Sequence, residues 1–208
     1  MKSGKLVVLE GIDGCGKHTQ SYLLRRTLVE RGFRVKMFSY PSLKGAFGKE
    51  IDGFLHKKIN LDKRAQFLLF TLNIMAEQEQ IRKALRKGYV VILNRYITST
   101  LAYQCRVEEM VKKIEAVNGL GLVEPDAILL LDISAETSMK RKYRQKNRNN
   151  KSLDRFEENK RFLSEVRRKY FILSKKHALC KGWKIIDSEK GKEEVRRQIK
   201  NYICYVLK

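Results

Sequence analysis

Continuous runs of apolar residues alternate along the chain with longer segments of helical periodicity. The runs at 6–9, 89–93 and 127–131 are apolar at every position, and 33–40 and 183–186 are two further strand candidates. An unbroken apolar run is typical of a strand that is covered on both faces of a parallel sheet. The pattern therefore predicts about five strands in one doubly wound parallel sheet.

The segments between the strands carry helix signals. The helix after the first strand stops at Gly32, and Asn60 or Asp62 can cap a long helix that ends near Gly88. Further helices are predicted over 98–118, with a possible break near Cys105, and over 193–207. Strands that alternate with helices favour an α/β fold, with helices on both faces and ligands at the carboxyl ends of the strands.

The first strand leads directly into a glycine-rich loop. Gly11, Gly16 and Lys17 are in register with the phosphate-binding pattern G-x-x-x-x-G-K-[ST], and a helical segment follows. Such a loop aims backbone N–H groups at phosphate oxygens, and its glycines allow a close approach. A simple glycine-rich turn is the alternative. His18 occupies the position of the hydroxyl that normally holds Mg²⁺, so either Thr19 or water must serve, or metal binding is altered.

Composition narrows the class of protein. A length of 208 residues suits one domain, and the net charge of +22 implies anionic ligands, either polyphosphates or nucleic acid. The cysteines are scattered without the spacing of a zinc site or a disulfide framework; they are Cys15, Cys105, Cys180 and Cys204. No apolar run is long enough for a signal peptide or a membrane span. We therefore expect a soluble protein of the cytoplasm with no membrane partner.

One segment, 139–155, is unusually basic. It holds eight Lys or Arg residues and one acid, Asp154, while Asn147, Asn149 and Asn150 lower its helix propensity. A charged run of this kind is often a solvated helix. Because the same chain carries a phosphate-binding loop, we interpret this segment as a mobile basic lid.

Five blocks of the chain together resemble the thymidylate kinases, P-loop nucleoside monophosphate kinases that transfer the γ-phosphoryl group of ATP to dTMP. The blocks are LEGIDGCGKHTQ (9–20), QFLLF (66–70), VVILNRYITSTLAYQ (90–104), EPDAILLLDISAE (124–136) and DRFEENKRFLSEVRRKY (154–170). The resemblance implies a P-loop NTPase fold, ATP and dTMP as substrates, Mg²⁺ as cofactor and a homodimer. It implies that ATP is bound by Gly11, Ile12, Asp13, Gly14, Cys15, Gly16, Lys17, His18 and Thr19.

The resemblance also implies roles in the dTMP site. Phe70 matches the aromatic residue that stacks on thymine, and Arg95 matches the arginine on the monophosphate, where a planar fork suits phosphate oxygens. Tyr103 matches a residue near the sugar, where a ring can exclude a 2′-hydroxyl. The full dTMP-binding set is Asp13, Phe70, Arg95, Ser99, Tyr103 and Gln104. For most of these side chains, an ordinary packing or capping role is the competing interpretation.

Phosphoryl transfer depends on alignment and on neutralising charge at the moving phosphoryl group. The resemblance assigns this work to Lys17, Arg95 and three lid arginines, Arg141, Arg144 and Arg148. For the metal it offers only Asp13 with His18 or Thr19, and no dedicated cage.

The chain departs from the family pattern in the acceptor site as well as at His18. Asn94 replaces an Asp before Arg95, Ile74 stands where an arginine commonly reads the thymine carbonyl, and Lys44 is the nearest substitute for an arginine missing after Pro41. These departures keep two alternatives open. One is a kinase for another deoxynucleotide or deoxynucleoside, and the other is a nucleotide-binding or nucleic-acid-binding protein without turnover.

Overall fold

The five predicted strands form one sheet in which all neighbours are parallel. The computed structural model describes residues 4–149, 155–156, 159–180 and 182–207. The strands are β1 (Lys5–Glu10), β2 (Val35–Ser39), β3 (Val90–Asn94), β4 (Ala127–Asp132) and β5 (Trp183–Asp187). Their order is β2-β3-β1-β4-β5, which confirms the expected doubly wound α/β fold.

Burial explains why the central strands are apolar throughout. Val7, Val8 and Leu9 of β1 are fully buried, because β1 lies between β3 and β4 and helices cover both faces of the sheet. The edge strand β2 instead carries exposed Lys36 and Ser39. The edge strands are therefore more exposed than the central ones.

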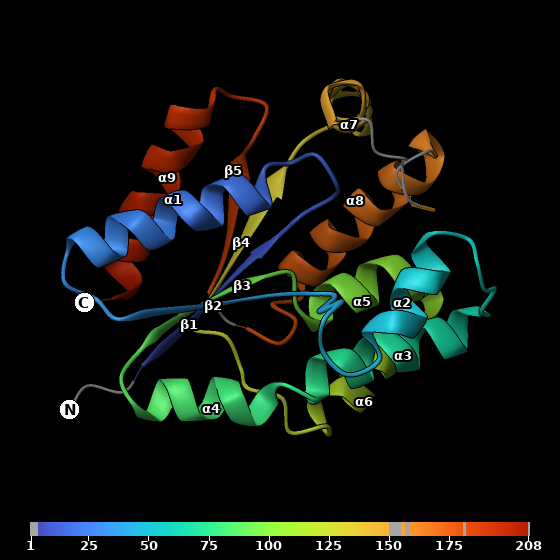
Figure 1. Ribbon diagram of the computed structural model, residues 1–208, viewed down its shortest axis with the longest axis horizontal. Helices are drawn as coiled ribbons and strands as arrows, with labels where there is room; N and C mark the ends of the chain where they lie inside the picture. The colour runs from blue at the N-terminus through green and yellow to red at the C-terminus, as the bar shows by residue number, and fades with distance from the viewer. Residues whose placement is uncertain (1–3, 150–154, 157–158, 181, 208) are drawn as a thin grey trace.

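Helices occupy both sides of the sheet. They are α1 (Lys17–Glu30), α2 (Gly48–Leu55), α3 (Lys63–Met75), α4 (Gln78–Arg86), α5 (Ile97–Gln104), α6 (Met110–Asn118), α7 (Ala135–Asn149), α8 (Lys160–Lys175) and α9 (Lys192–Val206), with a short 3₁₀ helix at Val107–Glu109. Helices α1 and α9 pack together on one face, whereas α4, α5 and α8 lie on the other (Figure 1). Within the described residues, no helix has the length and apolar character needed to span a bilayer.

Two helix predictions need correction. The long helix expected over 60–88 is two helices, because the chain turns at Ala76 and Glu77. Gln78 then donates to Ile74 O and accepts hydrogen bonds from Tyr96 OH and Val123 N, so tertiary partners hold this break in place. The expected N-cap is Asp62, whose carboxylate accepts from Ala65 N at 2.8 Å.

The basic segment 139–155 also differs from the expectation that its asparagines would interrupt a helix. Helix α7 continues through Asn147 and Asn149, so residues 139–149 are helical. Residues 150–154 of the expected lid lie outside the described residues. The break expected near Cys105 is present, since α5 ends at Gln104.

The strand order determines where a ligand can bind. The connection from β1 leads to β2 at one edge of the sheet, whereas the connection from β3 passes β1 and leads to β4 on its other side, so the strand order reverses beside β1 and leaves a crevice at its carboxyl end. The glycine-rich loop begins at this point, immediately after Glu10. The fold thus places the loop where α/β proteins bind their ligands.

Candidate active site

The glycine-rich loop packs tightly against β4 and α7. Gly11 has a φ of 139°, and a Cβ there would come within 2.4 Å of Leu131 O and 2.8 Å of Cys15 Sγ. Gly14 has a φ of 75°, and a Cβ there would meet Ser138 O at 2.9 Å. Glycine is required at both positions because the backbone is left-handed and the neighbours are backbone atoms.

Lys17, the first residue of α1, folds back over this loop. Its ammonium donates to Gly11 O at 3.0 Å and to Ile12 O at 2.9 Å. Burial, together with the nearby charge of Arg95, lowers the pKa of the Lys17 ammonium below its ordinary value. The lysine is therefore held by two weak carbonyl acceptors, which a phosphate oxygen can replace with a stronger, charged partner.

A cavity of about 680 Å³ opens beside the loop, and we call it the phosphate cavity. Of the nine residues predicted to bind ATP, Gly11 and Ile12 are buried and do not line this cavity. The other seven line it, namely Asp13, Gly14, Cys15, Gly16, Lys17, His18 and Thr19. Further cations of its wall are Arg141 and Lys142 of α7 and Lys190 and Lys192, which precede or begin α9. Cations from three parts of the fold thus surround an opening at a helix N-terminus, an arrangement suited to a polyphosphate.

A second cavity, of about 160 Å³, lies on the other side of Asp13 and Arg95, and we call it the acceptor cavity. Every residue of the predicted dTMP set lines it, namely Asp13, Phe70, Arg95, Ser99, Tyr103 and Gln104. Ile74 also lines it, whereas Lys44 does not. The charged groups of this cavity, Asp13 and Arg95, also line the phosphate cavity, and the rest of its wall is largely aromatic or aliphatic.

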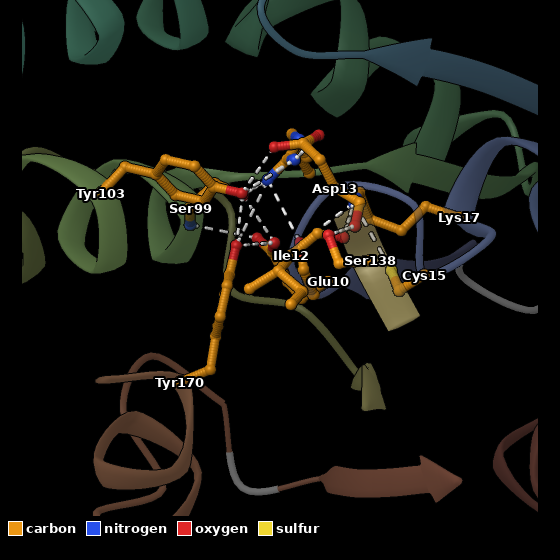
Figure 2. Close-up of polar contacts among 11 residues, drawn as sticks. Glu10, Ile12, Asp13, Cys15, Lys17, Ser99, Tyr103, Ser138 and Tyr170 are labelled. Carbon is orange, nitrogen blue, oxygen red and sulfur yellow. Dashed lines mark hydrogen bonds and ion pairs between the residues drawn. The ribbon is translucent and has the colours of Figure 1, made fainter. Parts of the chain in front are cut away.

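Arg95 and Asp13 form an ion pair at the junction of the two cavities. Arg95 Nη2 lies 2.6 Å from Asp13 Oδ1 and 3.2 Å from Tyr103 OH. Tyr103 OH in turn donates to Asp13 Oδ2 at 2.8 Å (Figure 2). The side chains of Arg95 and Asp13 keep 13% and 19% of their exposure. The guanidinium is thus oriented by the protein and still open to a ligand on one side.

The charges at this junction are strongly coupled. Burial on its own would raise the pKa of Asp13, but Arg95, Lys17 and Lys142, together with the hydrogen bond from Tyr103, hold that pKa well below its usual range. Burial would likewise lower the pKa of Arg95, but Asp13 raises it well above its ordinary value. Both groups therefore carry full charge at neutral pH.

The three predicted lid arginines differ in position. Arg141 lies in the phosphate cavity, where its guanidinium donates to Gly14 O at 3.3 Å and to Ser188 O at 2.8 Å. Arg144 is exposed and lies outside the lining of that cavity. The side chain of Arg148 lies outside the described residues. Of the three, the structure brings Arg141 to the loop.

The sequence analysis did not identify three polar residues of the site, Glu10, Ser138 and Tyr170. Glu10, fully buried at the end of β1, accepts hydrogen bonds from Ser99 and from Tyr170 of α8, and Ser138 Oγ donates to Asp13 O at 2.5 Å. A charged residue that ends an apolar strand directly before the loop was the available signal for Glu10. No local pattern marks Tyr170, because helix α8 approaches the loop only through the tertiary fold.

The fit of a divalent cation can be tested on the groups that line the phosphate cavity. No described set of three or more His, Cys, Asp or Glu residues could hold a metal ion, and Asp13 is already paired with Arg95. Asn94, however, lines this cavity, and its buried Oδ1 has no hydrogen-bond partner among the described residues. Such an acceptor suits a cation that arrives with a nucleotide and keeps several of its waters, as Mg²⁺ does.

Comparison with known proteins settles the family. A family model described as thymidylate kinase matches residues 9–199. The chain belongs to the thymidylate kinase family. The prediction of this family, and of a nucleoside monophosphate kinase as the enzyme class, is thereby confirmed.

Individual members of the thymidylate kinase family match along almost the full chain. The thymidylate kinase of Thermosipho melanesiensis is 33% identical, covering 97% of this chain and 98% of its own. The human thymidylate kinase is 29% identical, covering 96% and 89% respectively. The solved structure of the Candida albicans thymidylate kinase, an enzyme described as having broad substrate specificity, superposes with a TM-score of 0.77 at 27% identity, covering 97% of this chain and 91% of that one.

Proposed function

We propose that this protein transfers the γ-phosphoryl group of ATP to dTMP and forms dTDP, with the triphosphate in the phosphate cavity and the monophosphate in the acceptor cavity. The observation that carries the proposal is that the two cavities share Asp13 and Arg95. Two phosphate groups that enter from opposite sides would meet at this ion pair. Such an arrangement supports direct, in-line transfer between two nucleotides.

The residues of the chain act through position and charge. Amides after Gly11 and the Lys17 ammonium bind the terminal phosphates, and Arg95 binds the monophosphate. Arg141, which reaches the loop from α7, adds positive charge beside the transferring group. The attacking oxygen belongs to a phosphate that is already anionic, so the reaction needs no general base. We infer the same supporting role for Arg144 and Arg148 of the lid, 139–155.

We propose Mg²⁺ as the cofactor, bound with ATP. When bound, it would neutralise charge that develops on the phosphoryl group during transfer. Asn94 Oδ1, the Thr19 hydroxyl or the His18 ring, and Asp13 are the groups that could hold its waters in the phosphate cavity. Because these groups are few and scattered, the metal depends on the nucleotide for most of its ligands.

The acceptor cavity fits one pyrimidine nucleotide better than a purine. Phe70 offers a ring for stacking, Tyr103 closes the cavity beside Asp13, and Gln104 has a buried Oε1 without a hydrogen-bond partner among the described residues. That oxygen could accept the N3–H of thymine. Ile74, which is 2% exposed, supplies no charge for the base carbonyl, and this observation favours a second candidate, a kinase with a different or broader choice of acceptor.

A panel of acceptors tests the proposal. ADP release is measured with ATP, Mg²⁺ and, in turn, dTMP, dUMP, dCMP, dGMP, dAMP and thymidine. We expect the highest kcat/KM with dTMP. Saturating activity on another acceptor, with dTMP inert, would establish the second candidate. Absence of transfer to every acceptor, with salt-sensitive DNA binding, would show a nucleic-acid-binding protein instead.

We also propose a homodimer in the cytoplasm. Leu68 and Leu72, one turn apart on α3, and Val111 of α6 expose 59%, 42% and 49% of their surfaces. Apolar side chains of this size on adjacent helices are typical of a surface that a second subunit covers. A cytoplasmic location agrees with the four free cysteine thiols.

A further inference from the structure

Glu10 is a fully buried carboxylate with a complete set of hydrogen bonds. Its Oε1 accepts from Tyr96 N at 2.9 Å, from Thr98 Oγ1 at 2.5 Å and from Ser99 N at 3.2 Å. Its Oε2 accepts from Ser99 Oγ at 2.6 Å and from Tyr170 OH at 2.8 Å. A buried charge of this kind is tolerated because every acceptor position is used, and its two oxygens face different partners.

The Oε2 side of Glu10 sets the direction of two hydroxyl groups. The oxygens of Ser99 and Tyr170 also lie 2.7 Å apart, and since an ionised carboxylate and a guanidinium fix the directions, their protons point to Glu10 or to one another and not to Arg95. The lone pairs of these hydroxyl oxygens then face Arg95 Nη1, which lies 3.1 Å from Ser99 Oγ and 3.5 Å from Tyr170 OH (Figure 2). Glu10 thus prepares acceptors for an arginine that it does not itself contact.

The orientation of the Arg95 guanidinium depends on hydrogen-bond acceptors at both Nη1 and Nη2. Its backbone has a φ of 68°, a conformation that non-glycine residues rarely adopt. Asp13 and Tyr103 hold Nη2, whereas Gly11 O at 3.3 Å and the two hydroxyl groups hold Nη1. Without the hydroxyl acceptors, Nη1 would be left with the 3.3 Å hydrogen bond to Gly11 O, so the guanidinium would be oriented less firmly.

We propose that Glu10 and Tyr170 are positioning residues that aim the guanidinium of Arg95 at the monophosphate of the acceptor. The proposal rests on the proposed function, in which Arg95 binds that phosphate. It also gives helix α8 a role in the site, since Tyr170 is fully buried and its hydroxyl reaches β1 from a position 160 residues away in the chain.

The test compares equilibrium binding of dTMP with that of thymidine, which lacks the phosphate, by calorimetry. The variants are Glu10→Gln, whose amide would donate and reverse the hydroxyl groups, and Tyr170→Phe, which removes one of them. We expect each variant to lose roughly tenfold to a hundredfold in affinity for dTMP, the range for a hydrogen bond to a charged group, and to keep its affinity for thymidine within about twofold. Tyr170→Phe keeps the test valid if Glu10→Gln does not fold.

Thr98→Val is the matched control. Thr98 donates to Oε1 of Glu10, the oxygen on the opposite side from Arg95, so this variant should be less stable but should keep the ratio of dTMP to thymidine affinity. In an Arg95→Met background, Glu10→Gln should produce no further loss of dTMP affinity. Equal losses for both ligands, or losses that add to that of Arg95→Met, would overturn the proposal. Unsubstituted protein that fails to bind dTMP would instead reject the proposed function.

Discussion

The two cavities that meet at Asp13 and Arg95 are built in different ways. The acceptor cavity, about 160 Å³, is lined by side chains, and those at its charged end are already hydrogen-bonded to one another. The phosphate cavity, about 680 Å³, is lined by a backbone loop, exposed side chains such as His18 and Thr19, and cations from separate elements. Backbone amides bind any phosphate, whereas a preformed set of side chains selects one acceptor.

This difference predicts different effects for residue changes in the two cavities. A changed residue in the phosphate cavity, such as His18, leaves the amides in place. A changed residue in the acceptor cavity, such as Ile74, alters a wall that contacts the base directly. We therefore expect substitutions in the first cavity to alter the rate and substitutions in the second to alter the choice of substrate.

The largest effect should follow from Lys17→Ala. The ammonium is the buried cation of the phosphate loop, and its removal takes a fixed charge from the transferring group. We expect kcat to fall by a factor of about 10²–10³, the effect of removing one preorganised donor, ~3 kcal/mol. Steady-state kinetics measure it, with the exposed and distant Lys184→Ala as control. An unchanged kcat would remove the phosphate cavity from the mechanism.

Arg95→Lys tests the role of the acceptor cavity. A lysine keeps the charge but cannot provide the fork that contacts Asp13 and a phosphate together. We expect kcat/KM for dTMP to fall by roughly a hundredfold while KM for ATP changes little, since each lost charged contact costs about 1.5–3 kcal/mol. Equal increases in both KM values would show that the two cavities do not divide the substrates as proposed.

Gly11→Ala should affect stability more than Gly16→Ala. Both glycines have positive φ, at 139° and 95°, but a Cβ at Gly11 would meet Leu131 O at 2.4 Å, whereas nothing lies within 4 Å of a Cβ at Gly16. We expect the free energy of unfolding to fall by about 3 kcal/mol for Gly11→Ala and by about 1 kcal/mol for Gly16→Ala. Urea unfolding measures both. Similar losses would mean that strain alone, without the contact to β4, determines the requirement for glycine.

The contribution of the Asp13–Arg95 ion pair to the free energy of unfolding should depend on pH only under acidic conditions. Because the pKa of Asp13 is held below its usual range, its carboxylate stabilises the fold at all pH values above its unfolded pKa of about 3.9. That contribution is lost as the pH falls further. The difference in unfolding free energy between wild type and Asp13→Asn should therefore be constant from about pH 5 to 8 and shrink below about pH 4. A difference that did not change below pH 4 would show that the pKa of Asp13 is not lowered in the folded protein.

The smallest effect should come from His18→Ser. A hydroxyl at the start of α1 would supply the Mg²⁺ ligand that P-loops usually have. We expect the Mg²⁺ concentration at half-maximal rate to fall several-fold, with little change in KM for dTMP. His56→Ser, at an exposed position at the end of α2, is the control. An unchanged requirement for Mg²⁺ would show that the nucleotide and water supply every ligand.

The sequence was informative where the physical cause is local. The apolar runs predicted the strands because a parallel strand that is covered on both faces is mostly apolar, and the observed strand ends differ from the predicted ones by at most two residues. The spacing of Gly11, Gly16 and Lys17 predicted the loop, because a phosphate-binding turn is made by one continuous segment. Local propensity was misleading where tertiary contacts prevail, as at the turn before Gln78 and along the asparagine-rich helix α7.

The sequence by itself determined the class of fold, the family and the position of the glycine-rich loop, since each is encoded in periodicity or in contiguous motifs. Only the tertiary structure decided that Asp13 and Arg95 stand between two cavities, that Arg141 rather than Arg144 reaches the loop, and that Tyr170 completes the hydrogen bonds of Glu10. These arrangements join residues that are 80 to 160 positions apart. The direction of such a side chain depends on how helices pack on the sheet, which no local pattern records.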